Sequence, residues 1–214
     1  MEIIHNFAVL EGGDGSGTST QLALLEKRLA ETQAGSPAFF PTFEPSSGAV
    51  GKLIRAALKN EIRLQPETLA RLFAADRNEH LYAANGVIER CQKGELVVSD
   101  RYALSSLVYQ GIECGDELPR SLNAAFPLPE LLIFLDIDSE TALSRLKNRE
   151  SLEIYESLEF QKKVRAKYLS LLDDYRRSGV KVALIDAAQS PENVAAEVWS
   201  AVSKMPIFGS ENKY

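Results

Sequence analysis

Cysteine, histidine and tryptophan are scarce in this sequence, and their scarcity narrows the possible functions. The 214 residues include two Cys, two His and one Trp. Cys91 and Cys114 do not form a C-x-x-C pair, and His5 and His80 lie far apart. Neither a zinc site nor a disulfide framework is therefore expected. Because no cationic cluster flanks either cysteine, we expect two inert thiols.

Long hydrophobic runs and an excess of positive charge are also missing. No apolar stretch approaches the roughly 18 residues of a membrane span. The N-terminal residues lack the basic segment of a signal peptide, so we expect a cytoplasmic protein and no membrane partner. The formal net charge is −6 at pH 7, which disfavours binding to a nucleic-acid polymer. A local positive pocket for a small anion, such as a mononucleotide, is still compatible with this charge.

The composition that remains is that of an ordinary globular domain, with 45% hydrophobic and 25% charged residues. Short apolar runs alternate with amphipathic helical stretches, which is typical of an α/β fold with a parallel sheet and helices on both faces. No repeat or linker divides the chain, so we expect one domain over residues 1–205 and a frayed tail at 206–214. The five predicted strands are 6–10, 38–43, 95–99, 131–136 and 180–185.

Two later segments carry specific expectations. Ser190 and Pro191 are typical of the N-cap and first turn of a helix, and Val194, Val198 and Val202 would face its core side. The charged stretch 148–159 lies between two predicted helices and lacks a strong apolar period. It is therefore either a mobile lid over a ligand or a helix connection with a solvated charged face.

A glycine-rich loop follows the first predicted strand and opens a helix, which is the context of a phosphate loop. Successive backbone N–H groups can converge there on an anion, and the helix N-terminus adds partial positive charge. We expect this loop to bind ATP, with the Ser19 hydroxyl as a Mg²⁺ ligand. The predicted ATP-binding residues are Gly12, Gly13, Asp14, Gly15, Ser16, Gly17, Thr18, Ser19 and Thr20.

Thr18 occupies the position after the last glycine, where the usual pattern has lysine. Lysine supplies a mobile positive charge to the β- and γ-phosphates, whereas threonine offers only a hydroxyl. Losing one cation beside a transferring phosphoryl group costs about 3 kcal/mol unless another cation replaces it. The sequence thus predicts either a compensating cation elsewhere or slow catalysis.

Residues suited to a phosphoryl acceptor occur at two other places. Asp100 ends a predicted strand and would point toward Mg²⁺, while Arg101 would face the same crevice with a fork that fits a phosphate. The alternative is an Asp100–Arg101 ion pair that caps the strand. Phe73 and Arg77 share a predicted helix face and suit a base, unless Phe73 is core and Arg77 a solvated partner of Asp76 or Glu79.

Together these segments resemble the thymidylate kinase family over nearly the whole chain. The resemblance is carried by residues 11–17, by Asp100, Arg101 and Tyr102 with Ser105, by 109–111, by the helix 72–77 and by the loop 185–187. It implies a P-loop kinase fold with a short lid, a homodimer, and transfer of the ATP γ-phosphoryl group to dTMP with Mg²⁺.

The resemblance also implies roles for individual residues. Asp14 would contact the sugar 3′-hydroxyl, Phe73 would stack on thymine, and Arg77 would bind a base carbonyl. Arg101 would grip the acceptor phosphate, Ser105 and Tyr109 would close the base and deoxyribose pocket, and Glu44 would lie near the acceptor. Asp14, Arg101 and the lid residue Arg149 would act in catalysis, with Arg145 and Lys147 as lesser candidates for the lid cation. Alternatively, Arg145 and Arg149 merely pair with Glu150 or Glu153 at the surface.

Two departures from the family pattern remove positive charge from the site. The first is Thr18 in place of lysine, and the second is Phe43, where many members have arginine. Arg55 could compensate on the acceptor side, although a solvated helix face explains it equally well. Two rival functions therefore stay open: a kinase for another nucleotide or a deoxynucleoside, and a nucleotide-binding protein with weak catalysis.

Overall fold

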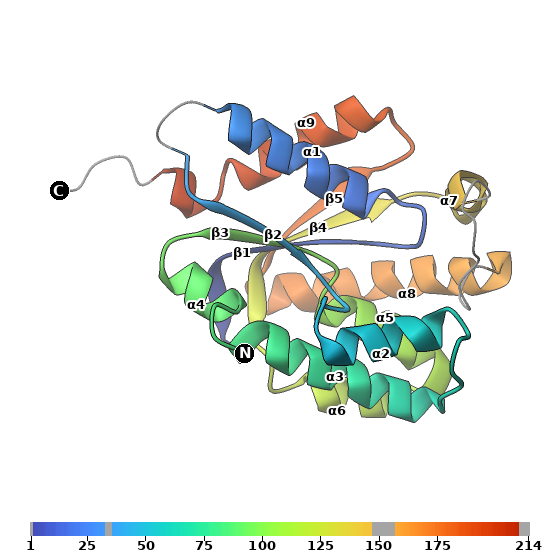
Figure 1. The fold of residues 1–214 in the computed structure, drawn as a ribbon. Coiled ribbons are helices and arrows are strands. Elements are labelled where there is room, and N and C mark those ends of the chain that lie inside the picture. Colours follow the sequence, from blue (N-terminus) through green and yellow to red (C-terminus); the bar gives the residue numbers. More distant parts are fainter. Residues whose placement is uncertain (1, 33–35, 147–156, 210–214) are drawn as a thin grey trace.

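Five parallel strands form the centre of the fold, in the order β2-β3-β1-β4-β5 (Figure 1). The computed structural model describes residues 2–32, 36–146 and 157–209. Most of the expected lid 148–159, including Arg149, therefore lies outside the described residues, as does Lys147. The predicted α/β fold and its five strands are confirmed. The strands are β1 (Ile3–Gly12), β2 (Phe39–Phe43), β3 (Leu96–Asp100), β4 (Leu128–Asp136) and β5 (Lys181–Asp186).

Strands β1 and β4 begin earlier than the sequence predicts. Their register shifts between Ile4 and Ala8, and Asn6 within this irregularity has a left-handed φ of 63°. Asparagine adopts this conformation more readily than most residues. The Asn6 backbone N–H donates to Glu130 Oε2 at 2.9 Å, and its side-chain amide donates to the Cys91 carbonyl at 3.2 Å. This irregularity, a β-bulge, thus lets the pairing of β1 with β4 continue on both sides of Asn6.

The helices form two layers around the sheet (Figure 1). Helices α1 (Thr18–Glu31) and α9 (Pro191–Val202) cover one face, while α7 (Ser139–Leu146) lies beside the carboxyl ends of the strands. The remaining helices belong to the opposite face. They are α2 (Ala49–Leu58), α3 (Pro66–Tyr82), α4 (Val87–Gln92), α5 (Ala103–Cys114), α6 (Glu117–Asn123) and α8 (Leu158–Arg177).

Each face of the sheet has its own hydrophobic core. Along β1, Phe7 and Val9 belong to the core beneath α3, α5 and α8, whereas Ala8 and Leu10 belong to the core beneath α1 and α9. Burying one such large side chain contributes about 1.5–3 kcal/mol. Because both faces are covered, the strands read as nearly continuous apolar runs.

The last helix follows the prediction closely. The Ser190 hydroxyl accepts a hydrogen bond from the Asn193 N–H at 3.3 Å, and α9 buries Val194, Val198 and Val202. The segment after Met205 was expected to fray, but it forms a 3₁₀ turn, η1 (Pro206–Phe208). Phe208 packs edge-on against Trp199, with ring centroids 5.5 Å apart, so this part of the tail is attached to α9.

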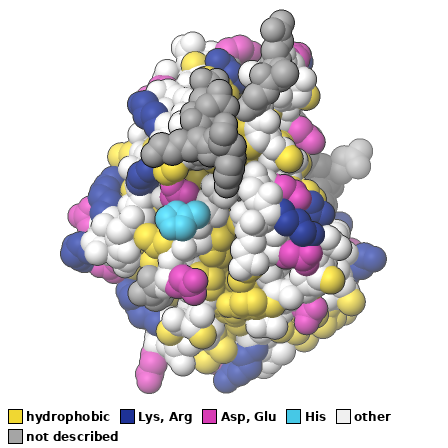
Figure 2. Space-filling view, turned by 90° about the vertical axis from the view of Figure 1, so that its left-hand side faces the viewer, with side chains coloured by type: hydrophobic (Ala, Val, Ile, Leu, Met, Phe, Trp, Pro, Cys, Tyr) yellow, Lys and Arg dark blue, Asp and Glu magenta, His cyan; other side chains and the backbone are white. Residues whose placement is uncertain are grey.

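The surface seen in Figure 2 carries charges of both signs. Lys and Arg side chains alternate with Asp and Glu side chains around a hydrophobic patch in the lower half of this view. Within the described ranges, no helix is both long and apolar enough to cross a bilayer.

Candidate active site

The phosphate loop connects the end of β1 to the start of α1, as predicted. Gly15 and Gly17 have φ angles of 83° and 95°, which most other residues rarely adopt. A Cβ at Gly15 would lie 2.3 Å from the Ala142 carbonyl oxygen of α7. Gly17 is the N-cap of α1, and no side chain caps this helix. The first N–H groups of α1 therefore face the loop and are suited to bind an anion.

Thr18 is buried, and three arginines that line hollows beside the loop already have partners. Arg101 binds Asp14 at 2.7 Å, and Arg145 donates to the Ala187 carbonyl at 3.0 Å. Arg165 forms a two-pronged pair with Asp136 at 2.7 and 2.9 Å. Arg145 thus binds a backbone carbonyl at the loop-side hollow, while Glu150 and Glu153 of the alternative surface pairs lie outside the described residues. Each of these guanidinium groups thus already has an acceptor in the protein.

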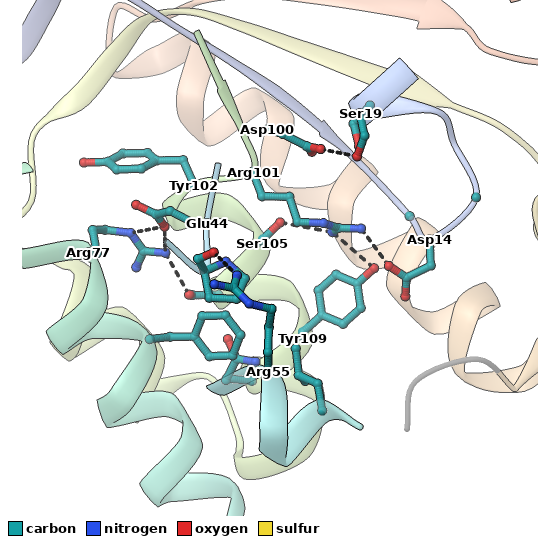
Figure 3. A pocket seen from close by; sticks show the side chains of 18 of the residues that line it. Asp14, Ser19, Glu44, Arg55, Arg77, Asp100, Arg101, Tyr102, Ser105 and Tyr109 are labelled. Carbon is teal, nitrogen blue, oxygen red and sulfur yellow. Dashed lines mark hydrogen bonds and ion pairs between the residues drawn. The ribbon is translucent and has the colours of Figure 1, made fainter. Parts of the chain in front are cut away.

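Ser19 and Asp100 meet beside the phosphate loop. The Ser19 hydroxyl donates to Asp100 Oδ2 at 2.5 Å (Figure 3). The other oxygen, Oδ1, is buried and has no hydrogen-bond partner within the described structure. A buried carboxylate oxygen without a partner, next to a hydroxyl, matches the oxygen ligands that Mg²⁺ prefers. The alternative, an ion pair between Asp100 and Arg101, does not form, since Arg101 pairs with Asp14.

Arg101 has an unusual backbone, and both terminal nitrogens of its guanidinium donate hydrogen bonds. Its φ of 71° is left-handed, a conformation that costs about 1–3 kcal/mol in a non-glycine residue. Its guanidinium donates to Asp14 Oδ1 at 2.7 Å and to the Gly12 carbonyl at 3.0 Å. Longer hydrogen bonds reach the hydroxyls of Ser105, Tyr109 and Tyr168. This arrangement holds a cation at the carboxyl ends of β1 and β3.

A cavity of about 260 Å³ extends from the phosphate loop to α3. Arg101 and Asp14 lie at one end and Arg77 with Glu44 at the other (Figure 3). Most of the predicted site residues line this cavity. They are Gly13, Asp14, Gly15, Gly17, Thr18, Ser19, Thr20, Glu44, Phe73, Arg77, Asp100, Arg101, Ser105 and Tyr109. The two remaining predicted loop residues, Gly12 and Ser16, do not line it. The Gly12 carbonyl accepts a hydrogen bond from Arg101, and Ser16 lines a second hollow, described below.

Arg77 is buried rather than solvated, so the alternative of a surface ion pair with Asp76 or Glu79 is wrong. Its Nε and Nη2 donate to Glu44 Oε2 at 2.9 and 2.6 Å, and it also donates to Asn123 and Ser106. Burial opposes the charge, but the Glu44 carboxylate raises the pKa of Arg77, which therefore stays a cation. Asp76 instead accepts from the Ser46 backbone and hydroxyl.

Arg55 also reaches the cavity from α2. Its guanidinium donates to the carbonyls of Pro45, at 2.5 Å, and Ser46, and it lies 5.8 Å from the centre of the Phe43 ring. A cation is therefore present close to the position where many family members have arginine in place of Phe43. These contacts favour a place at the cavity over a solvated helix face.

Four site residues were missed from the sequence. Glu11 is buried and accepts hydrogen bonds from Ser105 and from Tyr168. Gln161 of α8 donates to Asp14 Oδ2 at 2.8 Å. Gln110 lines the cavity, and its buried Oε1 lacks a partner within the described structure. Glu11 and Gln110 lie in the segments 11–17 and 109–111 that resemble the family. Tyr168 fits the apolar period of a long helix, which indicates a core residue, and no sequence signal marks Gln161.

A second hollow of about 360 Å³ lies on the other side of the phosphate loop. It is bounded by Gly15–Gly17 of the loop, by Arg145 of α7 and by the segment after β5. The loop 185–187, which resembles the family's adenine-side loop, contributes Ala187 to this wall. The phosphate loop therefore separates the two hollows, and two ligands, one in each hollow, would meet at the backbone of this loop.

Comparisons with known proteins agree with this geometry. The family model for thymidylate kinase matches residues 10–198. A Treponema pallidum protein named as a thymidylate kinase is 41% identical over 91% of this chain and 93% of its own length. Proteins of the same name from Pyrobaculum aerophilum and Methanocaldococcus jannaschii are each 38% identical over 94% of this chain, and 98% and 97% of their lengths are covered.

Proposed function

Because this chain belongs to the thymidylate kinase family, we propose that its two hollows hold dTMP and ATP on either side of the phosphate loop. The enzyme is a nucleoside monophosphate kinase that transfers the γ-phosphoryl group of ATP to dTMP and gives dTDP and ADP. The observation that carries the site assignment is the pair between Arg101 and Asp14 at 2.7 Å. It brings a phosphate-binding fork to the loop that cradles the donor.

dTMP is proposed to lie along the cavity between the phosphate loop and α3, with its phosphate on Arg101 and its base toward α3. Phe73 and Arg77 line the far end, so a ring face and a cation address the same base. The unpartnered Gln110 Oε1 offers an acceptor for the N3–H of thymine. Asp14, Ser105 and Tyr109 would border the sugar, while Glu44 would hold Arg77 in place. This placement accounts for the buried polar groups at both ends.

ATP is proposed to place its phosphates on the loop backbone and its base in the second hollow. The uncapped N-terminus of α1 and the loop N–H groups suit the β- and γ-phosphates. Arg145 and Gln189 border the hollow where the base would lie. Family kinases work with ATP and Mg²⁺, and here Ser19 with Asp100 Oδ1 would hold the ion.

The bound Mg²⁺ would neutralise charge on the donor phosphates. The protein's own contribution is positioning and charge: Arg101 orients the acceptor phosphate, whose oxygen is already anionic at neutral pH and needs no general base. The charge absent at Thr18 is proposed to come from Arg149 of the lid. Support comes from the nearby described arginines, Arg101, Arg145 and Arg165, which are engaged by other groups.

Two further properties are proposed. We propose a homodimer, consistent with the family resemblance and with the exposed Leu53 and Tyr82 on the neighbouring helices α2 and α3. Light scattering of the purified protein would test it. A cytoplasmic location is proposed because both cysteines are free thiols.

The test of the acceptor assignment is release of ADP from ATP and Mg²⁺ with each nucleoside monophosphate and with thymidine. dTMP should be the best acceptor and UMP poor, because the ring of Tyr109 leaves little space for a ribose 2′-hydroxyl and the base lies against Phe73. Equal turnover of dTMP and UMP would overturn the assignment. Binding of both nucleotides without ADP release would show a binding protein instead.

A further inference from the structure

Glu11, the residue before the phosphate loop, reaches from β1 to the start of α5. Its side chain is fully buried, and Oε1 accepts hydrogen bonds from the N–H groups of Tyr102 at 2.9 Å and Ser105 at 3.3 Å. Tyr102 is the N-cap of α5 and supplies no side-chain cap of its own. The Glu11 carboxylate therefore takes over this capping from a neighbouring strand, and its negative charge faces the positive end of the helix.

The second carboxylate oxygen orders two hydroxyls around Arg101. Oε2 accepts from the Ser105 hydroxyl at 2.6 Å and from the Tyr168 hydroxyl at 3.0 Å. The two hydroxyls also lie 2.7 Å from each other, so each can donate its single proton to Glu11 or to its neighbour, and its lone pairs can accept from a further group. Arg101 Nη1 donates to both, at 3.3 and 3.4 Å. Glu11 thus sets the direction of the groups that hold the guanidinium.

The backbone of Arg101 is fixed from the same strand. Its N–H donates to the Leu10 carbonyl at 2.9 Å, and the N–H of the next residue, Tyr102, donates to Glu11. A left-handed φ in a non-glycine residue persists only where the surroundings fix it. These two contacts from β1 hold the backbone immediately before and after the Arg101 side chain.

We propose that Glu11 is the positioning residue for the acceptor phosphate, and that it acts by holding the backbone and guanidinium of Arg101 in place. Glu11 does not line the cavity, so it acts without touching the substrate. The inference rests on the phosphate-binding role proposed for Arg101 above.

The surroundings of Glu11 act on its ionisation in opposite directions. Burial raises the pKa of Glu11 to about 7, against the hydrogen bond from Ser105 and the positive charge of Arg101. The charged and titratable groups around it are Arg101, Tyr168 and Tyr175. Burial raises the pKa of both tyrosines, so Arg101 carries the charge that faces Glu11.

The experiment compares binding of dTMP and thymidine, which differ by the phosphate, by calorimetry. Glu11→Gln keeps the shape of the side chain but presents an NH₂ donor to the Ser105 and Tyr168 hydroxyls or to the helix N–H groups. We expect this variant to lose about tenfold in dTMP affinity and to keep thymidine affinity within about twofold. Glu11→Asp, which keeps the charge on a shorter stem, should lie between wild type and Glu11→Gln.

A double-mutant cycle with Arg101→Met separates an effect through Arg101 from a general one. In the Arg101→Met background, Glu11→Gln should cause no further loss of dTMP affinity. An equal loss for dTMP and thymidine, or a full additional loss in that background, would overturn the inference. If Glu11→Gln does not fold, the same cycle is run with Glu11→Asp.

Glu130→Gln is the matched control, because Glu130 is also a buried carboxylate in the sheet and accepts the Asn6 N–H at 2.9 Å. This variant should leave the ratio of dTMP to thymidine affinity unchanged, and a changed ratio would overturn the inference. Unchanged dTMP affinity in Arg101→Met would overturn the role proposed for Arg101, and with it the inference. If Arg101→Met loses dTMP affinity but Glu11→Gln does not, the role of Glu11 is overturned while the role proposed for Arg101 stands.

Discussion

Arg101 and Asp14 form an ion pair at 2.7 Å between the residue after β3 and the phosphate loop. Each side chain is 20% exposed, so both remain reachable from the cavity. The pair places the acceptor cation against the donor loop before any nucleotide binds. When dTMP binds, its phosphate would take the place of Asp14 on Arg101, and its sugar hydroxyl would take the place of Arg101 on Asp14. The ion pair thus holds both side chains in position before the nucleotide arrives.

The first prediction concerns the charge missing at Thr18. If Arg149 supplies it, Arg149→Ala should lower kcat by about 10³-fold with a modest change in the acceptor KM, because this contact strengthens chiefly in the transition state. Thr18→Lys should recover part of the loss. Steady-state kcat of wild type, both single variants and the double variant measures this.

The double variant decides whether the two positions serve one developing charge. Coupled groups depart from additivity, so Thr18→Lys should help the Arg149→Ala enzyme more than it helps wild type. Additive effects would mean that the two positions act independently. An unchanged kcat in Arg149→Ala would remove this residue from the mechanism.

The second prediction tests the base end of the cavity. Phe73→Ala should weaken dTMP binding by about 1–3 kcal/mol through lost stacking and leave ATP binding nearly unchanged. Leu72→Ala is the matched control, since Leu72 is a half-buried neighbour on α3 that packs on the core and does not line the cavity. Calorimetric titration of both variants checks this, and equal loss of dTMP affinity in the two would assign Phe73 to the core.

The third prediction concerns the buried pair of Arg77 and Glu44. Arg77→Met should lower the free energy of unfolding by about 3–5 kcal/mol, because it leaves the Glu44 carboxylate buried without its cation. Adding Glu44→Gln should recover part of this loss. Urea unfolding monitored by circular dichroism measures wild type, both single variants and the double variant, and strictly additive losses would contradict the coupling. Arg120→Met, at an exposed position of α6, should change stability by less than about 0.5 kcal/mol.

The fourth prediction is a pH dependence of stability caused by Glu11. Its pKa is about 7 in the folded protein and 4.5 in the ordinary carboxyl group. The folded state therefore favours the protonated acid, so this contribution is fully present below pH 4.5 and is lost as the pH rises through 7. The shift corresponds to a contribution of about 3 kcal/mol.

The comparison that isolates this contribution is between wild type and Glu11→Gln at pH 5 and pH 8.5. Wild type should lose stability relative to the variant as the pH rises, because glutamine carries no charge at either pH. The free energy of unfolding from urea titrations provides the values. A pH-independent difference would show that Glu11 keeps an ordinary pKa.

The elements of the fold could be predicted because each depends mainly on neighbours in sequence. The apolar runs of β1 to β5 and the Ser190 N-cap are local patterns, and the structure contains them. The start of β1 could not be predicted in this way. It requires the bulge at Asn6, which is fixed by contacts with Glu130 and Cys91 that lie far away in the chain.

The same distinction applies to the site. The phosphate loop is contiguous, so its spacing alone indicated an anion site. Arg77 was recognised, but its burial was not, because its partners Glu44, Ser106 and Asn123 come from three other segments. The contact between Glu11 and Tyr168 spans 157 positions, and no local pattern reports such a pairing.

Helix α1, which begins in the phosphate loop, depends on the last helix for its packing. The α9 residues Val194, Val198 and Val202 share a core with the buried leucines of α1, and Gln21 donates to the Pro191 carbonyl at 3.0 Å. During translation, the nucleotide-binding segment is therefore made first but acquires its packing partner only after the ribosome has passed Val202. The opposite face, built from α2 to α6 and α8, can assemble earlier, so the order of synthesis favours folding of the acceptor side before the donor side.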